Sequence, residues 1–95
     1  MFDWDPRKAK INSLKHGVSF EEAATAFLDP RGLEGEDREH SESEARRLRL
    51  ARSSLGRVLI IAYTIRRRGN EEITRIISAR RASQNERKKY EVEED

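Results

Sequence analysis

The sequence predicts an α+β fold: a small antiparallel sheet, a meander of three or more strands, with two N-terminal helices and one C-terminal helix. Capping signals delimit a helix in residues 6–16, and apolar residues recur at helical spacing in residues 20–28. In residues 46–79 they alternate with arginines or form one continuous run, as in half-buried and central strands. A capping signal near residue 83 then opens another helix. Signals for helices therefore lie on both sides of a stretch with the periodicity of β-strands.

The N-terminal residues are expected to form a short strand and a helix. Residues 2–4 alternate apolar and polar side chains, which fits an edge strand. Asp5-Pro6 provides an N-cap followed by proline at the first helical position. This helix is expected to end near His16, because Gly17 can take the left-handed conformation of a helix C-terminus.

A second helix follows directly. Ser19 and Glu22 form a capping box, and Asp29-Pro30 stops the helix. The helix has one apolar stripe, which we expect to cover the sheet. Its members are Phe20, Ala23, Ala24, Phe27 and Leu28. Residues 31–43 are polar and acidic, so they are expected to form a loop or a short irregular strand.

Three strands and a helix complete the predicted fold. In the first strand, from Arg46 to Arg52, Leu48 and Leu50 share a face. The central strand, residues 58–65, is apolar on both faces; a turn at 67–72 leads to a strand at 73–79 that ends in two arginines. A capping box at residues 83–86 opens a helix through residue 90, and the acidic tail at 92–95 is expected to fray.

Length and composition indicate one domain, residues 1–95, with a thin core. Charged residues make up 40% of the chain and hydrophobic residues 35%. There is no cysteine, which excludes disulfides and cysteine-based metal sites and suits a reducing compartment. The chain has neither a signal-peptide pattern nor an apolar run long enough to span a bilayer. A cytoplasmic protein with no membrane association is expected.

Charge is distributed unevenly along the chain. Residues 46–81 hold eleven of the fifteen arginines and only two acids, Glu71 and Glu72, so this stretch carries a net charge of +9. The segments before and after it carry −5 and −2, which leaves a net charge of +2 for the whole chain. A basic sheet between acidic segments predicts a polyanionic partner, RNA or DNA.

Several motifs along the chain resemble those of the BrnT toxins of bacterial type II toxin–antitoxin systems, whose fold is similar to that of RelE-type ribonucleases. The motifs are FDWD at 2–5, KHGVSFEEA at 15–23, DP at 29–30, HSESEAR at 40–46, GRVLIIAYT at 56–64, RIISARRA at 75–82 and ERKKYE at 86–91. They occur in family order. Two departures are Ala51, where the family usually has glycine, and the turn at 66–74, which is a few residues longer than usual.

The resemblance implies a RelE-like endoribonuclease toxin that cleaves RNA and inhibits translation. It further implies neutralisation by a BrnA-type antitoxin in a toxin–antitoxin heterotetramer, with operator DNA bound only through the antitoxin. Two other functions use the same basic sheet: a non-enzymatic nucleic-acid-binding module, and an assembly module that only docks an acidic antitoxin. Tyr63, inside the apolar strand, is the one aromatic residue in residues 46–81, which argues against readout by base stacking.

RNA cleavage without a metal needs cations around the phosphorane, a base and an acid. Arginine supplies permanent charge and bidentate hydrogen bonds to phosphate oxygens. Arg46, Arg66, Arg75 and Arg80 are predicted for this role because they lie in matched motifs on strands or at strand ends. A solvated basic face without chemistry is the alternative for each. No metal-ligand spacing and no cofactor motif is present.

The base and the acid stay open at this stage. Glu44 and His40 match one motif, but arginines around Glu44 should lower its pKa and make it an orienting group or an ion-pair partner. His16 suits a C-capping role or a phosphate contact. Lys15 could act as a base only if its pKa were depressed, and Tyr90 packing on the sheet is favoured over Tyr90 acting as an acid. Further cations are predicted to contact RNA: Lys15, His16, Arg52 and Arg81.

Overall fold

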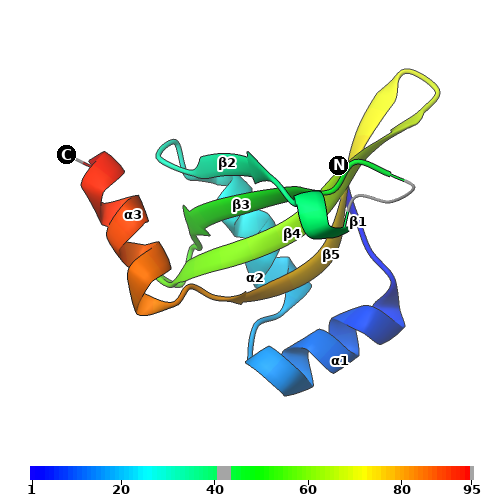
Figure 1. Cartoon of the computed structure of the whole chain (residues 1–95). Coiled ribbons are helices and arrows are strands. Elements are labelled where there is room, and N and C mark those ends of the chain that lie inside the picture. The colour runs from blue at the N-terminus through cyan, green and yellow to red at the C-terminus, as the bar shows by residue number, and fades with distance from the viewer. Residues whose placement is uncertain (41–43, 95) are drawn as a thin grey trace.

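The computed structural model describes residues 1–40 and 44–94, with the backbone alone for residues 40, 93 and 94. Five strands form one sheet in the order β1-β5-β4-β3-β2 (Figure 1). They are β1 (Phe2–Asp3), β2 (Leu33–Glu36), β3 (Arg47–Arg52), β4 (Val58–Arg68) and β5 (Glu71–Arg81). The helices are α1 (Pro6–His16), α2 (Phe20–Thr25) and α3 (Gln84–Glu94), with 3-10 turns η1 (Ala26–Leu28) and η2 (Arg38–His40).

The sheet confirms the predicted α+β class and the meander. β2, β3, β4 and β5 pair antiparallel in sequence order, and β1 pairs in parallel with β5 at Thr74 and Arg75. Residues 31–43, for which a loop or a short strand was expected, supply the edge strand β2 and the turn η2. Described residues contain no helix long and apolar enough to cross a membrane.

The two faces of the sheet are covered differently. α1 and α2 pack on one face, where Phe20 of α2 lies in the main core with Ala51, Leu59 and Ile61. α3 reaches the opposite face near the β3–β4 turn, where Tyr90 packs on residues 50 and 58. The rest of this second face is left without a covering helix, and it holds the candidate site.

The predicted helix caps are present. Asp5 accepts a hydrogen bond from the N–H of Arg7, and Ser19 accepts one from that of Glu22. Gly17 ends α1 with φ of 68°. The second helix, however, is α-helical only to residue 25. The tighter 3-10 turn that follows rotates Leu28 off the apolar stripe, so Leu28 is 83% exposed and the prediction that it covers the sheet is wrong.

The turn predicted at 67–72, with Gly69-Asn70, is present but shorter, because β4 and β5 continue as a hairpin that projects beyond the other strands (Figure 1). Arg67 pairs with Glu72 and Arg68 with Glu71, so opposite charges face each other across the strands. The turn itself is the dipeptide at 69–70, in which Gly69 takes φ of 65°. Cross-strand charge pairing therefore extends a hairpin that composition alone assigns to a loop.

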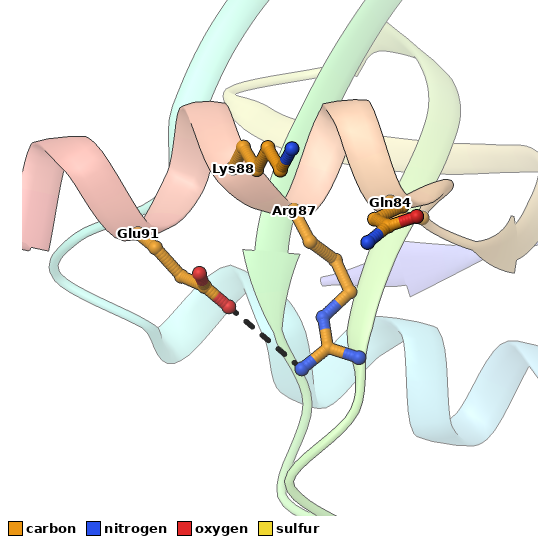
Figure 2. A pocket seen from close by; sticks show the side chains of 5 residues that line it. Gln84, Arg87, Lys88 and Glu91 are labelled. Carbon is orange, nitrogen blue, oxygen red and sulfur yellow. Dashed lines mark ion pairs between the residues drawn. The ribbon is translucent and has the colours of Figure 1, made fainter.

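At the C-terminus, α3 continues to Glu94 where fraying from residue 92 was predicted. No glycine or proline interrupts it, and glutamate is a good helix former. Arg87 pairs with Glu91 one turn later at 3.8 Å, as Figure 2 shows. Asp95 lies outside the described residues.

Candidate functional site

A cleft of about 490 Å³ lies on the sheet face that α1 and α2 leave uncovered, and we call it the sheet cleft. Its floor comes from the middle of β3, β4 and β5. α1 ends at one rim, η2 and the residue before it form another, and α3 contributes one carboxylate. The lining residues are His16, Asp37, Glu39, Arg46, Leu48, Ile60, Ala62, Ser78, Ala79, Arg80 and Glu86.

Small side chains make the hollow. Ala62 and Ser78 are directly opposite each other in the floor, and the register of β4 and β5 shifts between Ala62 and Tyr63. Ile77 is thereby left as an extra residue on β5. β-Bulges of this kind bend a strand and re-aim its side chains, and they are frequent beside active sites. The cleft thus combines a small apolar floor with a charged rim.

Asn12 fixes the position of His16 relative to β5. Its Nδ2 donates to the Ala79 carbonyl at 2.7 Å, and its Oδ1 accepts from the Ala79 N–H at 3.0 Å. The same Nδ2 donates to the Val18 carbonyl at 3.0 Å, just past the end of α1. These buried bonds hold the end of α1, and with it His16, against the strand that carries Arg80.

Arg80 is bound by a carboxylate. Its guanidinium donates to both oxygens of Glu86 at 2.8 and 2.9 Å. Glu86 also closes a capping box, accepting from the Ser83 N–H at 2.7 Å. The hydrogen bonds from Arg80 lower the pKa of Glu86 to about 2. Arginine binds carboxylate and phosphate groups with the same bidentate geometry.

A second group, which we call the Arg66 cluster, extends the site along β4 and β5. Arg66 donates to both carboxylate oxygens of Glu44 at 2.9 and 3.0 Å, and Arg75 donates to Asp3 at 2.7 Å. Hydrogen bonding to Arg66 lowers the pKa of Glu44, and the charges of Arg75 and Arg46 add to the effect. Arg46 thus links the cluster to the sheet cleft.

The arginines of the basic stretch do not form a bare cationic surface. At least six arginines of residues 46–81 form ion pairs, five of them with acids from outside this stretch. The acidic flanks fold back onto the strands, because an unpaired charge close to the core is costly. The innermost example is Arg49, which bonds to Glu34 and to the carbonyls of residues 26 and 29.

The structure brings together most of the predicted catalytic residues. Arg46 and Arg80 line one cleft together with His16, which was predicted as an RNA contact, and Arg66, Arg75 and Glu44 lie in the adjoining cluster. The backbone of His40 ends η2, but its side chain is outside the described structure, so its predicted role stays a prediction. Lys15 is exposed beside His16.

Two predicted RNA contacts lie elsewhere. Arg52 stacks over the Tyr90 ring at 5.3 Å and donates to the Gly56 carbonyl. Arg81 is paired with Leu59 on the sheet face opposite Arg80 and influences the carboxylate of Glu22. The structure does not place either residue at the cleft, and the predicted RNA contacts remain predictions.

Sequence reasoning missed the acidic part of the rim. Asp37, Glu39 and Glu86 line the cleft, whereas the sequence indicated only a polar loop and a helix cap for them. The available signal was the charge imbalance itself, since acidic flanks around a basic stretch predict pairing between them. Which acid meets which arginine depends on the register of distant elements, and no local pattern encodes that.

Three aromatic residues, Tyr90, Trp4 and Tyr63, have structural roles. Tyr90 is buried and donates to Asp29 at 2.6 Å, as its predicted packing role requires. Trp4 packs edge-on against Phe20, with centroids 5.9 Å apart. Burial, with a hydrogen bond to Glu34, raises the pKa of Tyr63 to about 12. None of these rings is presented to the cleft as a stacking surface.

A second hollow of similar size lies along α3 (Figure 2). It is lined by Ala82, Gln84, Arg87, Lys88 and Glu91. Its arginine is paired with the glutamate one turn on, and no other element converges on it. Within residues 1–40 and 44–94, moreover, no group of three or more histidines and acids is placed to hold a metal ion. The sheet cleft is therefore the stronger candidate site.

Comparisons with known proteins agree with this architecture. The chain is similar to the ribonuclease toxin BrnT of Brucella abortus, whose crystal structure matches it with a TM-score of 0.62 and 21% sequence identity over 88% of this chain and 99% of that one. At this identity the likeness shows the fold. A search among curated proteins found no match. Residues 4–86 match the family described as "Ribonuclease toxin, BrnT, of type II toxin-antitoxin system", a span that includes both α1 and Glu86. The chain therefore belongs to the BrnT family of ribonuclease toxins.

Proposed function

We propose that this BrnT-family toxin is a metal-independent endoribonuclease, that the sheet cleft is its active site, and that a BrnA-type antitoxin neutralises it. The observation that carries the proposal is the convergence of His16, Arg46 and Arg80 around one cleft with a small apolar floor. Two permanent cations and one imidazole can stabilise the charge of the transition state and carry one of the two proton transfers that phosphodiester cleavage without a metal ion needs.

The reaction is an attack by the ribose 2′-oxygen on the adjacent phosphorus. The bond from phosphorus to the 5′-oxygen breaks, which gives a 2′,3′-cyclic phosphate and a 5′-hydroxyl. One proton leaves the 2′-oxygen and one reaches the departing 5′-oxygen. Arg80 and Arg46 bind the non-bridging oxygens, whose negative charge grows in the transition state. Histidine can transfer a proton near neutral pH, so His16 is assigned to one of the two transfers.

Without RNA, the carboxylate of Glu86 occupies the position on Arg80 that a substrate phosphate would take. It holds the Arg80 fork until RNA arrives, and substrate binding exchanges one bidentate anion for another. With a pKa of about 2, Glu86 is a poor proton acceptor at neutral pH. The same argument applies to Glu44, whose pKa is lowered by Arg66. Both carboxylates orient arginines, and neither is assigned as the base.

The Arg66 cluster extends RNA binding beyond the scissile phosphate. Arg66 and Arg75 lie further along β4 and β5 on the side of Arg46. Phosphates of a single strand laid across the sheet would meet Arg80 and then this cluster. Lys15, exposed next to His16, is positioned to bind the strand at the other rim.

Partners follow from membership in the family. A type II toxin has an RNA target and a protein antitoxin. We assign the antitoxin to the BrnA type, the complex to a heterotetramer and operator binding to the antitoxin. RNA cleavage places the activity in the cytoplasm. The antitoxin is expected to bury part of residues 46–81, and contacts mapped only to α1 and α2 would contradict this.

The test is cleavage of a defined RNA in excess EDTA by the purified wild-type chain and by Arg80→Ala. Arg80 is 44% exposed at its side chain, so its loss should cost no more than about 1 kcal/mol of stability. Activity should fall at least a hundredfold. Arg87→Ala, which removes an exposed arginine of α3 outside the cleft, is the matched control and should cleave normally.

Product ends complete the test. A 2′,3′-cyclic phosphate or a 3′-phosphate, formed in EDTA and lost in Arg80→Ala, would support the proposal. Cleavage that requires a divalent ion would overturn metal independence. RNA that is bound but left intact, with or without ribosomes, would favour the alternative of a non-enzymatic binding module. Equal losses of stability and activity in Arg80→Ala would remove Arg80 from the site.

A further inference from the structure

We propose that the outer face of α1, with the groove between α1 and β5, is a docking surface for an acidic amphipathic segment of the antitoxin. The proposal rests on the proposed function for the identity of the partner. The partner binds at α1 through acidic and apolar side chains. The features that carry the proposal are unpaired cations, exposed apolar side chains and a groove that opens into the sheet cleft.

α1 is entirely cationic in its charged residues. Its sequence, PRKAKINSLKH, contains Arg7, Lys8, Lys10 and Lys15 and no acid. Within the part of the chain that the structure describes, none of these four side chains forms an ion pair, whereas arginines of the sheet are paired with carboxylates from other segments. The fold thus neutralises the sheet and leaves α1 positive. A partner that complements this helix carries acids.

In α1 a polar side chain is buried and apolar side chains are exposed, the reverse of a typical surface helix. α1 buries Asn12 against β5 and exposes Ile11 and Leu14, which are 63% and 81% accessible. Residues three apart lie next to each other on a helix surface, so these two side chains form one apolar spot. Arg7 and Lys10 border it on the solvent side. An apolar centre with a charged rim is the composition of a protein-binding surface.

A groove continues this surface toward the active site. It has a volume of about 210 Å³ and lies between Lys8, Ile11 and Lys15 of α1 and Ile77 and Ser78 of β5. The bulge in β5 leaves Ile77 at this position, and β1 pairs with β5 only at residues 74 and 75. The groove therefore offers both apolar and cationic contacts along an open stretch of strand.

The groove and the sheet cleft share two lining residues, His16 and Ser78. A segment seated in the groove would end against the imidazole that we assign to proton transfer. Its acidic side chains would be drawn toward Arg80 and Arg46 in the place of RNA phosphates. Docking on α1 would therefore block substrate without requiring any change in the fold.

A protein segment fits this surface better than RNA does. Ile11 and Leu14 offer nothing to a phosphate, and the one aromatic ring of α1, the imidazole of His16, lies at the far end of the groove beside the sheet cleft. An amphipathic segment uses both properties at once, with its apolar side on residues 11 and 14 and its acids on the surrounding lysines.

The experiment measures the affinity of separately purified antitoxin for toxin variants by calorimetry. The double variant Ile11→Glu/Leu14→Glu should bind at least a hundredfold more weakly, and Lys8→Glu at least tenfold more weakly at low salt. Leu55→Glu, at a side chain 69% exposed in the β3–β4 turn, is the matched control and should bind within twofold of wild type. Glutamate favours helix, so the α1 variants should fold, and thermal melting checks this.

RNA assays separate the outcomes. The free double variant should cleave and bind RNA within twofold of wild type, because Ile11 and Leu14 lie outside the sheet cleft. Antitoxin affinity within twofold of wild type in the double variant would overturn the proposal. So would a loss of RNA affinity without a loss of antitoxin affinity, which would make α1 an RNA-binding surface. If the wild-type toxin fails to cleave RNA while α1 still governs antitoxin binding, the docking surface stands and the ribonuclease proposal falls.

Discussion

The carboxamide of Asn12 forms hydrogen bonds with the backbone of β5, as a neighbouring strand would. It satisfies both the N–H and the C=O of Ala79 and then reaches the carbonyl of Val18, and it is only 6% exposed. A buried side chain that completes three backbone hydrogen bonds leaves all three unpaired if it is removed. One residue of α1 therefore sets the geometry between His16 and Arg80.

Replacement Asn12→Ala should lower the free energy of unfolding by about 3 kcal/mol, since buried polar groups left without partners are costly. Urea denaturation of the free toxin measures the loss. Ser13→Ala, at the next and exposed position of the same helix, should change stability by less than about 0.5 kcal/mol. Equal stability of the two variants would contradict the role given to Asn12.

Glu86 should make stability depend on pH in the acid range. Its folded pKa is about 2, below the ordinary value of 4.5, because Arg80 donates to the carboxylate. A lowered folded pKa contributes stability that is complete above pH 4.5 and is lost as the pH falls toward 2. In Glu86→Gln this contribution should be absent.

Thermal melting from pH 6 down to pH 2 tests this expectation. The difference in melting temperature between wild type and Glu86→Gln should shrink as the pH falls through that window. Other carboxylates with lowered pKa values, Glu22 and Glu44 among them, are present in both proteins and cancel in the difference. A constant difference across the range would show that the pairing with Arg80 adds no stability.

At the scale of elements, α3 is held by few contacts. Among the side chains described for this helix, Tyr90 alone is buried, at 1% exposure, against residues 50 and 58. Its hydroxyl donates to Asp29, and the Arg52 guanidinium covers its ring. Burial, with the bond to Asp29, raises the pKa of Tyr90. The ion pair between Arg80 and Glu86 also joins α3 to β5.

Tyr90→Ala should therefore release α3 from the sheet, at a cost of about 3–5 kcal/mol typical of a buried aromatic side chain. Tyr90→Phe keeps the ring packing and loses only the hydrogen bond, at about 1 kcal/mol. Hydrogen exchange over residues 84–92 measures the release. Similar protection of this segment in Tyr90→Ala and in wild type would show that other contacts hold the helix.

Elements with strong local signals were predictable from sequence. Asp5-Pro6, Ser19 and Gly17 mark helix ends through local hydrogen bonds and backbone geometry, and the structure confirms all three. The hairpin tip at 66–72 was not predictable, because its strands depend on pairing between arginines and glutamates of opposite strands. Leu28 was misassigned for a related reason, since a periodic pattern does not reveal where an α-helix tightens to a 3-10 turn.

The cations of the candidate site were predictable from the sequence, and so was Glu44 as an ion-pair partner, whereas the other acids were not. Arg46, Arg66 and Arg80 lie in or beside strands that the apolar pattern predicts. The other acids come from β1, from η2 and the residue before it, and from α3, which are separated from the arginines in sequence. The sequence therefore predicts which surface is basic, and only the fold shows how much of that charge is already neutralised.

For the whole molecule, this neutralisation sets how strongly RNA binding should respond to salt. Single-stranded binding loses affinity with a logarithmic slope of about −0.7 for each phosphate contacted. Contacts from Arg46, Arg66, Arg75, Arg80 and Lys15 would give a slope of about −3.5, whereas a bare face with the full +9 charge of residues 46–81 would give about −6.

Fluorescence anisotropy with an uncleavable 2′-deoxy analogue, titrated at several salt concentrations, measures the slope. A value near −3.5 is expected for the wild-type toxin, and Arg80→Ala should make it shallower by about 0.7. Arg87→Ala should leave it unchanged. A slope near −6 would show that RNA displaces most of the carboxylates from the sheet.

The sheet order also determines when the toxin can become active during its synthesis. β1 and β5 are neighbours in space but lie at opposite ends of the chain, and the cleft needs His16 from the first helix and Arg80 from the last strand. A ribosome must release β5 before these two side chains can meet, so a growing polypeptide carries no assembled cleft. On the proposed active site, a nascent chain that has not yet released β5 could not cleave RNA.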